Sequence, residues 1–456
     1  MNNNLNFFKI SKFFLYLAPF STAIVTASTL FPFIVGKYVF FRAAVDLALI
    51  FFLLGLLLQD KLSVMGSRLS AKLKSPLVIA VSIFVLIFIL SGFFGVNPSN
   101  SFWSNFERGE GGIQIIHLYV FFLLLAVVFR EEKDWLKLFW VLIAAAALMI
   151  LYGAAAGLKM SGFIGGAFGG SGFRFSGSIG NPAYVATYLV FSLFYACYLL
   201  FGADRRESDK NSRGIIFYWE KLKTLKGIIL MFFMILFFVF FWLAATRGAF
   251  VGLLAAIVAG TAYFVYGRKN LRKWFFGGVV VLLLAVGTMV YFKDTAFVKS
   301  IPGSRVFDIS FSAQTWQHRT YMWKIAYDGF KERPLLGWGP ENFINIFDRH
   351  FNVQYFNPTE GFGAWFDRAH SIYFDYLAET GILGLSSYLG IFAVFYWQLF
   401  KRRDDQRRQS ALQNALIFAI PVAYLVQGIV LFDVLPTYLN VFSVLAFASY
   451  KFQKMD

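Results

Sequence analysis

A forty-residue stretch of the chain, from Gly227 to Tyr266, contains a single charged side chain, Arg247, near its middle. At about 1.5 Å per helical residue the stretch would be about 60 Å long, about twice the thickness of the hydrocarbon core of a bilayer. We therefore expect it to cross a membrane twice and to turn near the arginine. Arg247 would then lie at a membrane surface, either as a functional cation or as an anchor that reaches the phospholipid headgroups.

The composition of the whole chain indicates a protein that spans the membrane many times. Of its 456 residues 58% are hydrophobic and only 15% are charged, which excludes an ordinary soluble fold. The single cysteine, Cys197, cannot form an intrachain disulfide. The Cys and His residues also lack the spacing of a metal site, so we expect neither a metal nor another cofactor.

Apolar windows predict twelve transmembrane helices and an all-α polytopic membrane fold. The predicted helices span residues 13–35, 38–58, 77–95, 113–129, 135–157, 181–202, 227–246, 248–266, 274–292, 382–400, 411–432 and 434–450. The chain would then divide into three parts. These are residues 1–292 with helices one to nine, residues 293–381 as one long extracytoplasmic loop carrying amphipathic helices, and residues 382–456 with the last three helices and a cytoplasmic tail.

The distribution of basic residues predicts the orientation. If both termini are cytoplasmic, the inside segments hold 27 of the 42 Lys and Arg residues, and most of the others lie in the long loop, whose length exempts it from the charge rule. The net charge of +17 is thus explained mostly by topology, and we expect no nucleic-acid partner. In this orientation Arg247 and the long loop lie on the same outer face of the membrane.

The long loop contains two predicted helices separated by a turn. From Gln314 to Lys331, aromatic residues recur every three to four positions on the face that carries Arg319, which is typical of a helix lying on the membrane. The residues Pro334 to Pro340 then form a turn. A second helix is expected to begin near Asp367 and to stop at Gly381, with His370, Phe374 and Leu377 on one face.

Among the four histidines of the chain, His370 is the strongest catalytic candidate. His117 lies within a predicted span, where it could simply bond a neighbouring helix. His370 is expected near the outer membrane surface, on the same side as Arg247 and Arg319. An imidazole can take a proton near neutral pH, and two guanidinium groups can hold a diphosphate in bidentate fashion. A base such as His370 beside two diphosphate-binding arginines indicates a transferase.

The order of several short motifs resembles the O-antigen ligase and O-antigen polymerase superfamily of bacterial membrane glycosyltransferases. The resemblance extends over roughly Gly177 to Tyr450. The motifs are Gly180-Asn181-Pro182, Thr246-Arg247-Gly248, the segment from His318 through Trp323 to Pro334-Leu335-Leu336-Gly337-Trp338-Gly339, and Ala369-His370-Ser371 followed by Glu379-Thr380-Gly381. The chain departs from the family at Ser371, where many members have Asn.

The resemblance implies a GT-C-like membrane fold and a reaction on the outer face of the bacterial cytoplasmic membrane. Members move a glycan from undecaprenyl diphosphate to an acceptor such as lipid A core, without a metal. Carried over to this chain, the resemblance implies that Arg247 and Arg319 bind the diphosphate and that His370 activates the acceptor hydroxyl. Attack from the side opposite the diphosphate predicts inversion at the anomeric carbon.

Three further residues are candidate contacts to the acceptor or its sugar, namely Glu341, Trp323 and Glu107. Glu341 follows the Gly-Pro turn, Trp323 lies on the aromatic face, and Glu107 lies in an outer loop with several glycines. Each also has a purely structural interpretation as a packed or solvated side chain.

The sequence does not determine the identity of the acceptor. A ligase, a polysaccharide polymerase and a protein O-oligosaccharyltransferase would share the donor chemistry, and their acceptor pockets lie in poorly patterned loops. A polysaccharide flippase is the alternative from another class. It would need polar residues within the spans and usually two related halves, whereas these spans are almost free of charge.

Overall fold

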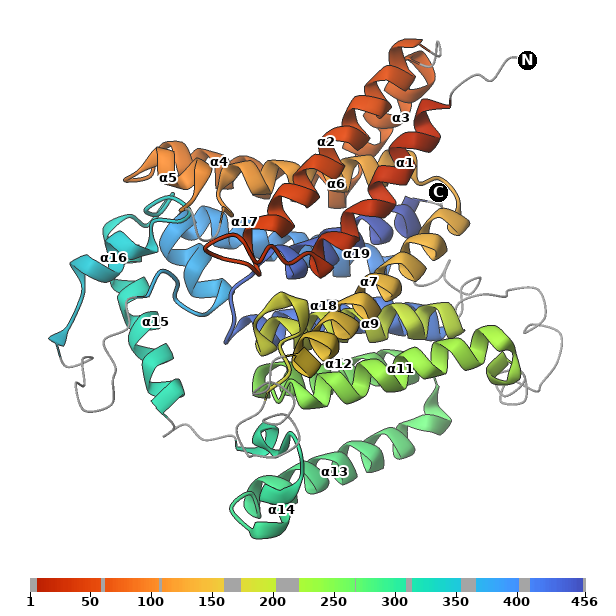
Figure 1. Cartoon of the computed structure of the whole chain (residues 1–456), viewed down its shortest axis with the longest axis vertical. Coiled ribbons are helices and arrows are strands. Elements are labelled where there is room, and N and C mark those ends of the chain that lie inside the picture. The colour runs from red at the N-terminus through yellow and green to blue at the C-terminus, as the bar shows by residue number, and fades with distance from the viewer. Residues whose placement is uncertain are drawn as a thin grey trace. The chain divides into compact units, whose positions relative to one another are not determined.

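The structure is a computed structural model that describes residues 6–58, 62–105, 109–159, 174–201, 221–266, 268–308, 314–353, 366–401 and 411–453. Within these ranges the regular structure is entirely helical (Figure 1). The prediction of an all-α polytopic membrane protein is confirmed, because many of the helices are long and apolar enough to cross a bilayer.

Nine helices in the described ranges qualify as membrane spans by length and composition. They are α2 (Val35–Leu58), α4 (Pro76–Phe93), α7 (Glu132–Lys159), α9 (Pro182–Phe201), α11 (Leu225–Leu243), α12 (Arg247–Val265), α13 (Lys269–Tyr291), α17 (Ile372–Lys401) and α18 (Ala411–Gly428). Two further predicted spans are also helical, as α6 (Gly112–Val128) and α19 (Leu435–Gln453). The total of twelve spans stays a prediction.

The first predicted span, residues 13–35, is wrong as a continuous helix. The chain forms α1 (Phe7–Leu17) and then the 3-10 helix η1 (Ala18–Ala23), and it becomes extended at Ile24. Pro19 stands in the first turn of η1, where a proline can neither donate a backbone hydrogen bond nor continue the α-helix before it. The apolar window therefore overestimated the length of this helix.

The described residues form two compact units. Unit 1 comprises Met1–Glu131, Ser310–Gln398 and Gly428–Asp456, and unit 2 comprises Glu132–Ile309 and Leu399–Gln427. In unit 1, α1 packs against α2, and α6 packs against α19 (Figure 1). In unit 2, α9 packs against both α7 and α11.

The turn predicted near Arg247, within the apolar stretch from Gly227 to Tyr266, lies at the predicted place. The helix α11 ends at Leu243, and α12 begins at Arg247 with Thr246 as its N-cap residue. Between them Ala245 adopts a left-handed conformation with φ of 47°. The prediction of two helices that meet beside Arg247 is confirmed.

Two motifs that are far apart in sequence are joined in unit 1 through their backbones. The helix α15 (Gln314–Glu332) leads into the Pro334–Gly339 turn, which is followed by the short helix α16 (Phe343–Arg349). Val96, just before the short helix α5 (Pro98–Trp103), donates its N–H to the Trp338 carbonyl of this turn at 2.9 Å. The turn is hydrogen-bonded to the part of α17 around Gly381, where φ of 67° and ψ of −168° kink the helix. The four bonds run from Trp338 N–H to Ala378 O (3.0 Å), Gly339 N–H to Glu379 O (2.8 Å), Ile382 N–H to Pro334 O (2.8 Å) and Leu383 N–H to Leu335 O (3.3 Å).

This joint predicts a strict requirement for glycine at position 381. A Cβ on Gly381 would collide with the Leu335 carbonyl, and its backbone conformation is one that other residues rarely adopt. We expect Gly381→Ala to destabilise the protein by at least about 1–3 kcal/mol, the usual cost of such strain. The melting temperature of the detergent-purified protein measures the effect.

The matched control is Gly390→Ala in the same helix, where a Cβ would meet open space. Alanine favours an α-helix over glycine by about 1 kcal/mol, so this variant should melt at the wild-type temperature or slightly above it. Equal melting of both variants would contradict the proposed role of the joint.

Candidate functional site

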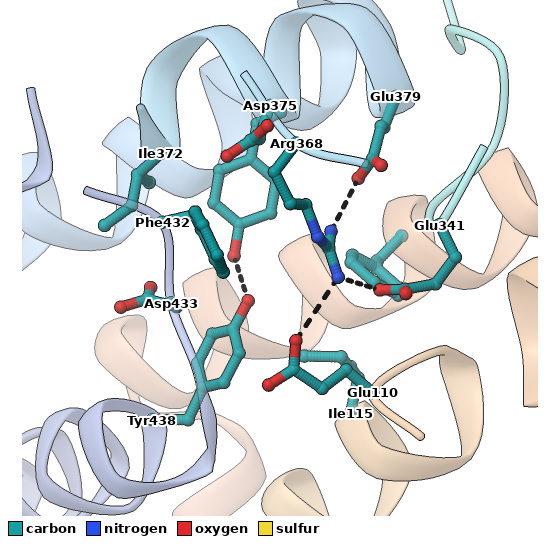
Figure 2. A pocket seen from close by; sticks show the side chains of 12 residues that line it. Glu110, Ile115, Glu341, Arg368, Ile372, Asp375, Glu379, Phe432, Asp433 and Tyr438 are labelled. Atoms are coloured by element: carbon teal, nitrogen blue, oxygen red, sulfur yellow. Dashed lines mark hydrogen bonds and ion pairs between the residues drawn. The ribbon is translucent and has the colours of Figure 1, made fainter. Parts of the chain in front are cut away.

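The centre of the candidate site is the buried guanidinium of Arg368, which lies in the loop before α17. It forms ion pairs with three carboxylates, as Figure 2 shows. Its Nη2 lies 3.2 Å from Glu110 Oε2 and contacts Glu341 Oε1, and its Nη1 lies 3.3 Å from Glu379 Oε2. The side chains of all four residues are at most 9% exposed. We call this group the Arg368 cluster.

The electrostatics of the cluster keep Arg368 charged. Burial by itself lowers the pKa of Arg368, but the nearby charges of Glu341, Glu379, Glu110 and Asp375 outweigh it and raise that pKa above the ordinary value. One cation thus faces several carboxylates. The surroundings of Arg368 are predominantly acidic, and they are well supplied with hydrogen-bond acceptors.

Two hydroxyl groups bind the carboxylate oxygens of Glu110 and Glu341 that do not contact Arg368. The Tyr38 hydroxyl on α2 donates a hydrogen bond to Glu110 Oε1, and the Ser104 hydroxyl after α5 donates to Glu341 Oε2 at 2.7 Å. The Asn100 side chain also donates to the Glu341 carbonyl at 2.6 Å. The orientation of Glu110 and Glu341 is therefore set by α2 and α5 as well as by Arg368.

His370 lies two residues after Arg368 in a left-handed backbone conformation with φ of 58°. Its Nδ1 is 3.2 Å from the Arg368 carbonyl oxygen, and its half-buried ring contacts the rings of Phe366 and Phe432 at centroid distances of 5.5 and 5.2 Å. The loop is held on the other side by Asp375, whose Oδ1 accepts a hydrogen bond from Ala369 N–H at 2.6 Å. His370 is thus positioned directly by the segment that the Arg368 cluster anchors.

The helix that was expected to begin near Asp367 begins at Ile372 instead. The reason is the left-handed turn at His370, which an α-helix cannot contain. His370 therefore does not share a helical face with Phe374 and Leu377, as the sequence suggested. The predicted stop at Gly381 agrees with the observed kink.

A pocket opens beside the Arg368 cluster (Figure 2). Its lining combines carboxylates with aromatic and aliphatic side chains, namely Phe88, Glu110, Ile115, Glu341, Arg368, Ile372, Asp375, Tyr376, Glu379, Phe432, Asp433 and Tyr438. The hydroxyls of Tyr376 and Tyr438 lie 3.1 Å apart within it. Phe432 lines the pocket and contacts the His370 ring, so the pocket and the histidine are adjacent.

The structure brings one of the three candidate acceptor contacts to this site. Glu341 belongs to the Arg368 cluster. Trp323 on α15 stacks on Phe374 with a centroid distance of 5.2 Å and contacts Trp316 at 5.4 Å, so its ring is engaged in packing. Glu107 lies outside the described residues. The roles of all three stay predictions.

The two arginines that were predicted to hold a diphosphate belong to different units. Arg319 is half-buried on α15 in unit 1, which also contains His370. Arg247 belongs to unit 2, where it pairs with Asp308. Their convergence on one ligand stays a prediction.

Arg368, Glu110 and Glu379 are site residues whose importance the sequence analysis missed. Glu379 lies in the Glu379-Thr380-Gly381 motif, and Glu110 is a lone carboxylate among glycines just before an apolar helix. A charge at the edge of an apolar segment is costly without a partner, and this cost was the available signal. His117, by contrast, pairs across helices with Asp46 at 3.2 Å, in line with its expected structural role.

Among the residues that the structure describes, no group of three or more His, Cys, Asp or Glu side chains is arranged to hold a metal ion. The carboxylates of the Arg368 cluster are paired with the guanidinium instead. Independence from metal stays a prediction of the sequence analysis.

The buried ion pairs predict a large effect of substituting Arg368. Arg368→Ala would leave three carboxylates buried without a cation, a change that typically costs about 3–5 kcal/mol. Arg368→Lys keeps the charge but cannot point two donors at separate carboxylates with the same geometry, so we expect an intermediate loss. The melting temperature in detergent measures both variants.

Arg349→Ala is the matched control, because Arg349 pairs with Glu332 at 3.0 Å on the surface of the same unit, where an ion pair contributes little. If Arg368→Ala melted like Arg349→Ala, the Arg368 cluster would not be the anchor of the site.

Comparison with known proteins supports the resemblance seen in the sequence. The model of a family described as O-antigen ligase matches residues 232–389, a segment that contains Arg247, Arg319, Glu341 and His370. This is a family of membrane glycosyltransferases, and the apolar helices agree with an integral membrane protein. No curated protein matches the chain.

Proposed function

We propose that this chain, whose residues 232–389 belong to the O-antigen ligase family, transfers a glycan from undecaprenyl diphosphate to a surface acceptor such as lipid A core. The observation that carries the proposal is that the family match includes all three residues the chemistry needs, Arg247, Arg319 and His370. The reaction takes place on the outer face of the cytoplasmic membrane, with both termini of the chain in the cytoplasm.

The donor reacts by breaking the bond between its anomeric carbon and a diphosphate oxygen. Negative charge then grows on the diphosphate, and the main electrostatic task is to stabilise it. Arg247 and Arg319 supply planar donors that match phosphate oxygens, and each charge-assisted hydrogen bond contributes about 1.5–3 kcal/mol. Lys at either position would retain the charge but lose the bidentate geometry.

His370 accepts the proton of the acceptor hydroxyl as that oxygen attacks the anomeric carbon. The Arg368 carbonyl next to Nδ1 can only accept a hydrogen bond, so it favours the tautomer that carries the proton on Nδ1. The lone pair of the imidazole is then on Nε2, which takes the proton. A base in this position typically contributes about 10²–10⁴-fold in rate. Attack opposite the diphosphate inverts the anomeric configuration.

The acceptor sugar binds at the opening of the pocket beside His370, because the interior of about 20 Å³ has room for only about one water molecule. Carboxylate oxygens such as those of Glu341 accept hydrogen bonds from sugar hydroxyls, and the aromatic ring of Phe432 offers an apolar surface. Because Glu341 also pairs with Arg368, acceptor binding and the position of the His370 loop are coupled. Support for this role comes from the adjacency of the pocket and the histidine.

The first test is a gel of surface glycans from a deletion strain that carries wild-type protein or His370→Ala. We expect His370→Ala to reduce transfer at least about 100-fold, because the base is lost, while its amount and its donor binding stay at the wild-type level. Long chains that persist on the lipid carrier but are absent from the acceptor identify a ligase, and single repeats on the acceptor identify a polymerase. Wild-type product from His370→Ala would remove this residue from the mechanism.

His350→Ala is the matched control, since His350 also belongs to unit 1 but pairs with Glu332 at 3.1 Å beyond α16. It should support a wild-type glycan pattern. An unchanged pattern in the deletion strain itself would instead direct attention to protein glycosylation or to transport.

A companion variant tests the diphosphate clamp. Arg247→Lys should lower transfer despite the retained charge, by roughly tenfold if one charge-assisted hydrogen bond is lost. The initial rate of transfer from a lipid-linked donor by the purified protein measures this loss. Full activity of Arg247→Lys would mean that the arginine only anchors the chain.

A further inference from the structure

In unit 2 a single carboxylate, that of Asp308, is shared between two cations. Arg247 Nη2 contacts one of its oxygens, Oδ2, and Lys293 Nζ lies 3.0 Å from the other, Oδ1. Arg247 also donates from Nε to the Arg305 carbonyl at 3.4 Å. Each oxygen of the carboxylate thus has its own cation, which is the way two oxygens of a phosphate group are commonly held.

The backbone that carries Asp308 is held in place by packing as well as by the ion pairs. Asp308 follows the 3-10 helix η3 (Ser304–Phe307), and the Phe307 ring contacts Trp242 and Phe250 at centroid distances of 5.7 and 5.8 Å. The Trp242 indole also donates to the Pro302 carbonyl at 2.6 Å. These contacts attach η3 to α11 and α12, so the segment would stay in place if the carboxylate lost its partners.

Positive charge predominates around Asp308. Arg305 acts on both Asp308 and Arg247 through its charge. Arg174 approaches the same turn, because its guanidinium donates to the Ala244 carbonyl at 3.2 Å and to the Thr246 hydroxyl at 2.9 Å. The side chains that surround the beginning of α12 therefore favour an anion, and Asp308 supplies a single negative charge.

The bound carboxylate is accessible to a competing anion. The side chains of Arg247 and Lys293 are each 26% exposed, and that of Asp308 is 46% exposed. Partial burial raises the pKa of Asp308, but the hydrogen bond from Lys293 and the charges of Arg247, Lys293 and Arg305 lower it below the ordinary value. Asp308 is accordingly ionised at neutral pH and competes with other anions for the two cations.

We propose that Arg247 and Lys293 form a binding site for a phosphate ester, and that Asp308 occupies this site as an internal counter-ion until the ligand replaces it. Its main ligand, under the function proposed above, is the diphosphate of the lipid-linked donor. A phospholipid headgroup presents the same chemistry. Lys293 and Asp308 are thereby added to the residues that determine donor affinity, and the return of Asp308 to the cations favours release of the spent carrier.

The direct test is the affinity for inorganic pyrophosphate, measured by calorimetry on the full chain in nanodiscs of zwitterionic lipid. Asp308→Asn removes the competing charge and should tighten binding about tenfold, whereas Lys293→Ala removes one cation and should weaken it about tenfold. Unchanged or weaker binding by Asp308→Asn would overturn the proposal, because Asp308 would then be a clamp that organises the cations. Unchanged binding by Lys293→Ala would overturn it as well.

The chain offers a matched control pair on the neighbouring segment. Asp294 and Lys299 lie 3.4 Å apart, with side chains 79% and 60% exposed, and therefore provide the same charges without the site. Asp294→Asn and Lys299→Ala should leave pyrophosphate affinity unchanged. Shifts as large as those of Asp308→Asn and Lys293→Ala would indicate a general charge effect and overturn the proposal.

Two further arms distinguish the sources of the phosphate. If the donor is the ligand, Asp308→Asn lowers the KM for the lipid-linked donor in zwitterionic nanodiscs. If a headgroup is the ligand, phosphatidylglycerol in the nanodisc competes with pyrophosphate, and the donor KM does not change. The calorimetric measurement requires no transfer reaction, so failure of the proposed function and failure of this site are separate results.

Discussion

The candidate site depends on the burial of one arginine among three carboxylates. A buried charge without a partner is strongly unfavourable, so Arg368 can be buried only where Glu110, Glu341 and Glu379 are also present. These residues come from segments that lie up to 269 positions apart in the chain, between residue 110 and residue 379. The cluster therefore joins the start of α6, the turn before α16 and the first turns of α17, and it holds the loop that carries His370.

The motifs by which the chain resembles the O-antigen ligase family gain a physical explanation from this arrangement. The Gly-Trp-Gly turn and the Glu-Thr-Gly segment are joined by backbone hydrogen bonds. A Cβ on Gly337 would collide with the backbone of Glu379, and a Cβ on Gly381 would collide with the backbone of Leu335. Glu379 contributes its backbone carbonyl to the joint and its carboxylate to the Arg368 cluster. The residues that build the scaffold and those proposed to act on the substrate are thus neighbours in sequence.

The sequence predicted the features that depend on local periodicity. The aromatic repeat placed α15 within one residue of its observed ends, and the single arginine in an apolar stretch located the α11–α12 turn. It failed where a proline or a left-handed residue interrupts a helix, as at Pro19 and His370. It also missed the Arg368 cluster, because partners far apart in sequence leave no periodic pattern. Arg247 and His370 belong to different units, and their convergence on one ligand stays a proposal.

The coupling between the Arg368 cluster and the His370 loop can be measured directly by hydrogen exchange. Glu110→Gln removes one carboxylate charge from a segment that is distant in sequence, while it leaves residues 366–372 unchanged. If the cluster positions His370, the Ala369 amide, which is bonded to Asp375 in the intact loop, should exchange faster in this variant than in the wild-type protein. An Ala369 amide that exchanges at the wild-type rate would contradict the account, because the His370 loop would then keep its conformation without the full cluster.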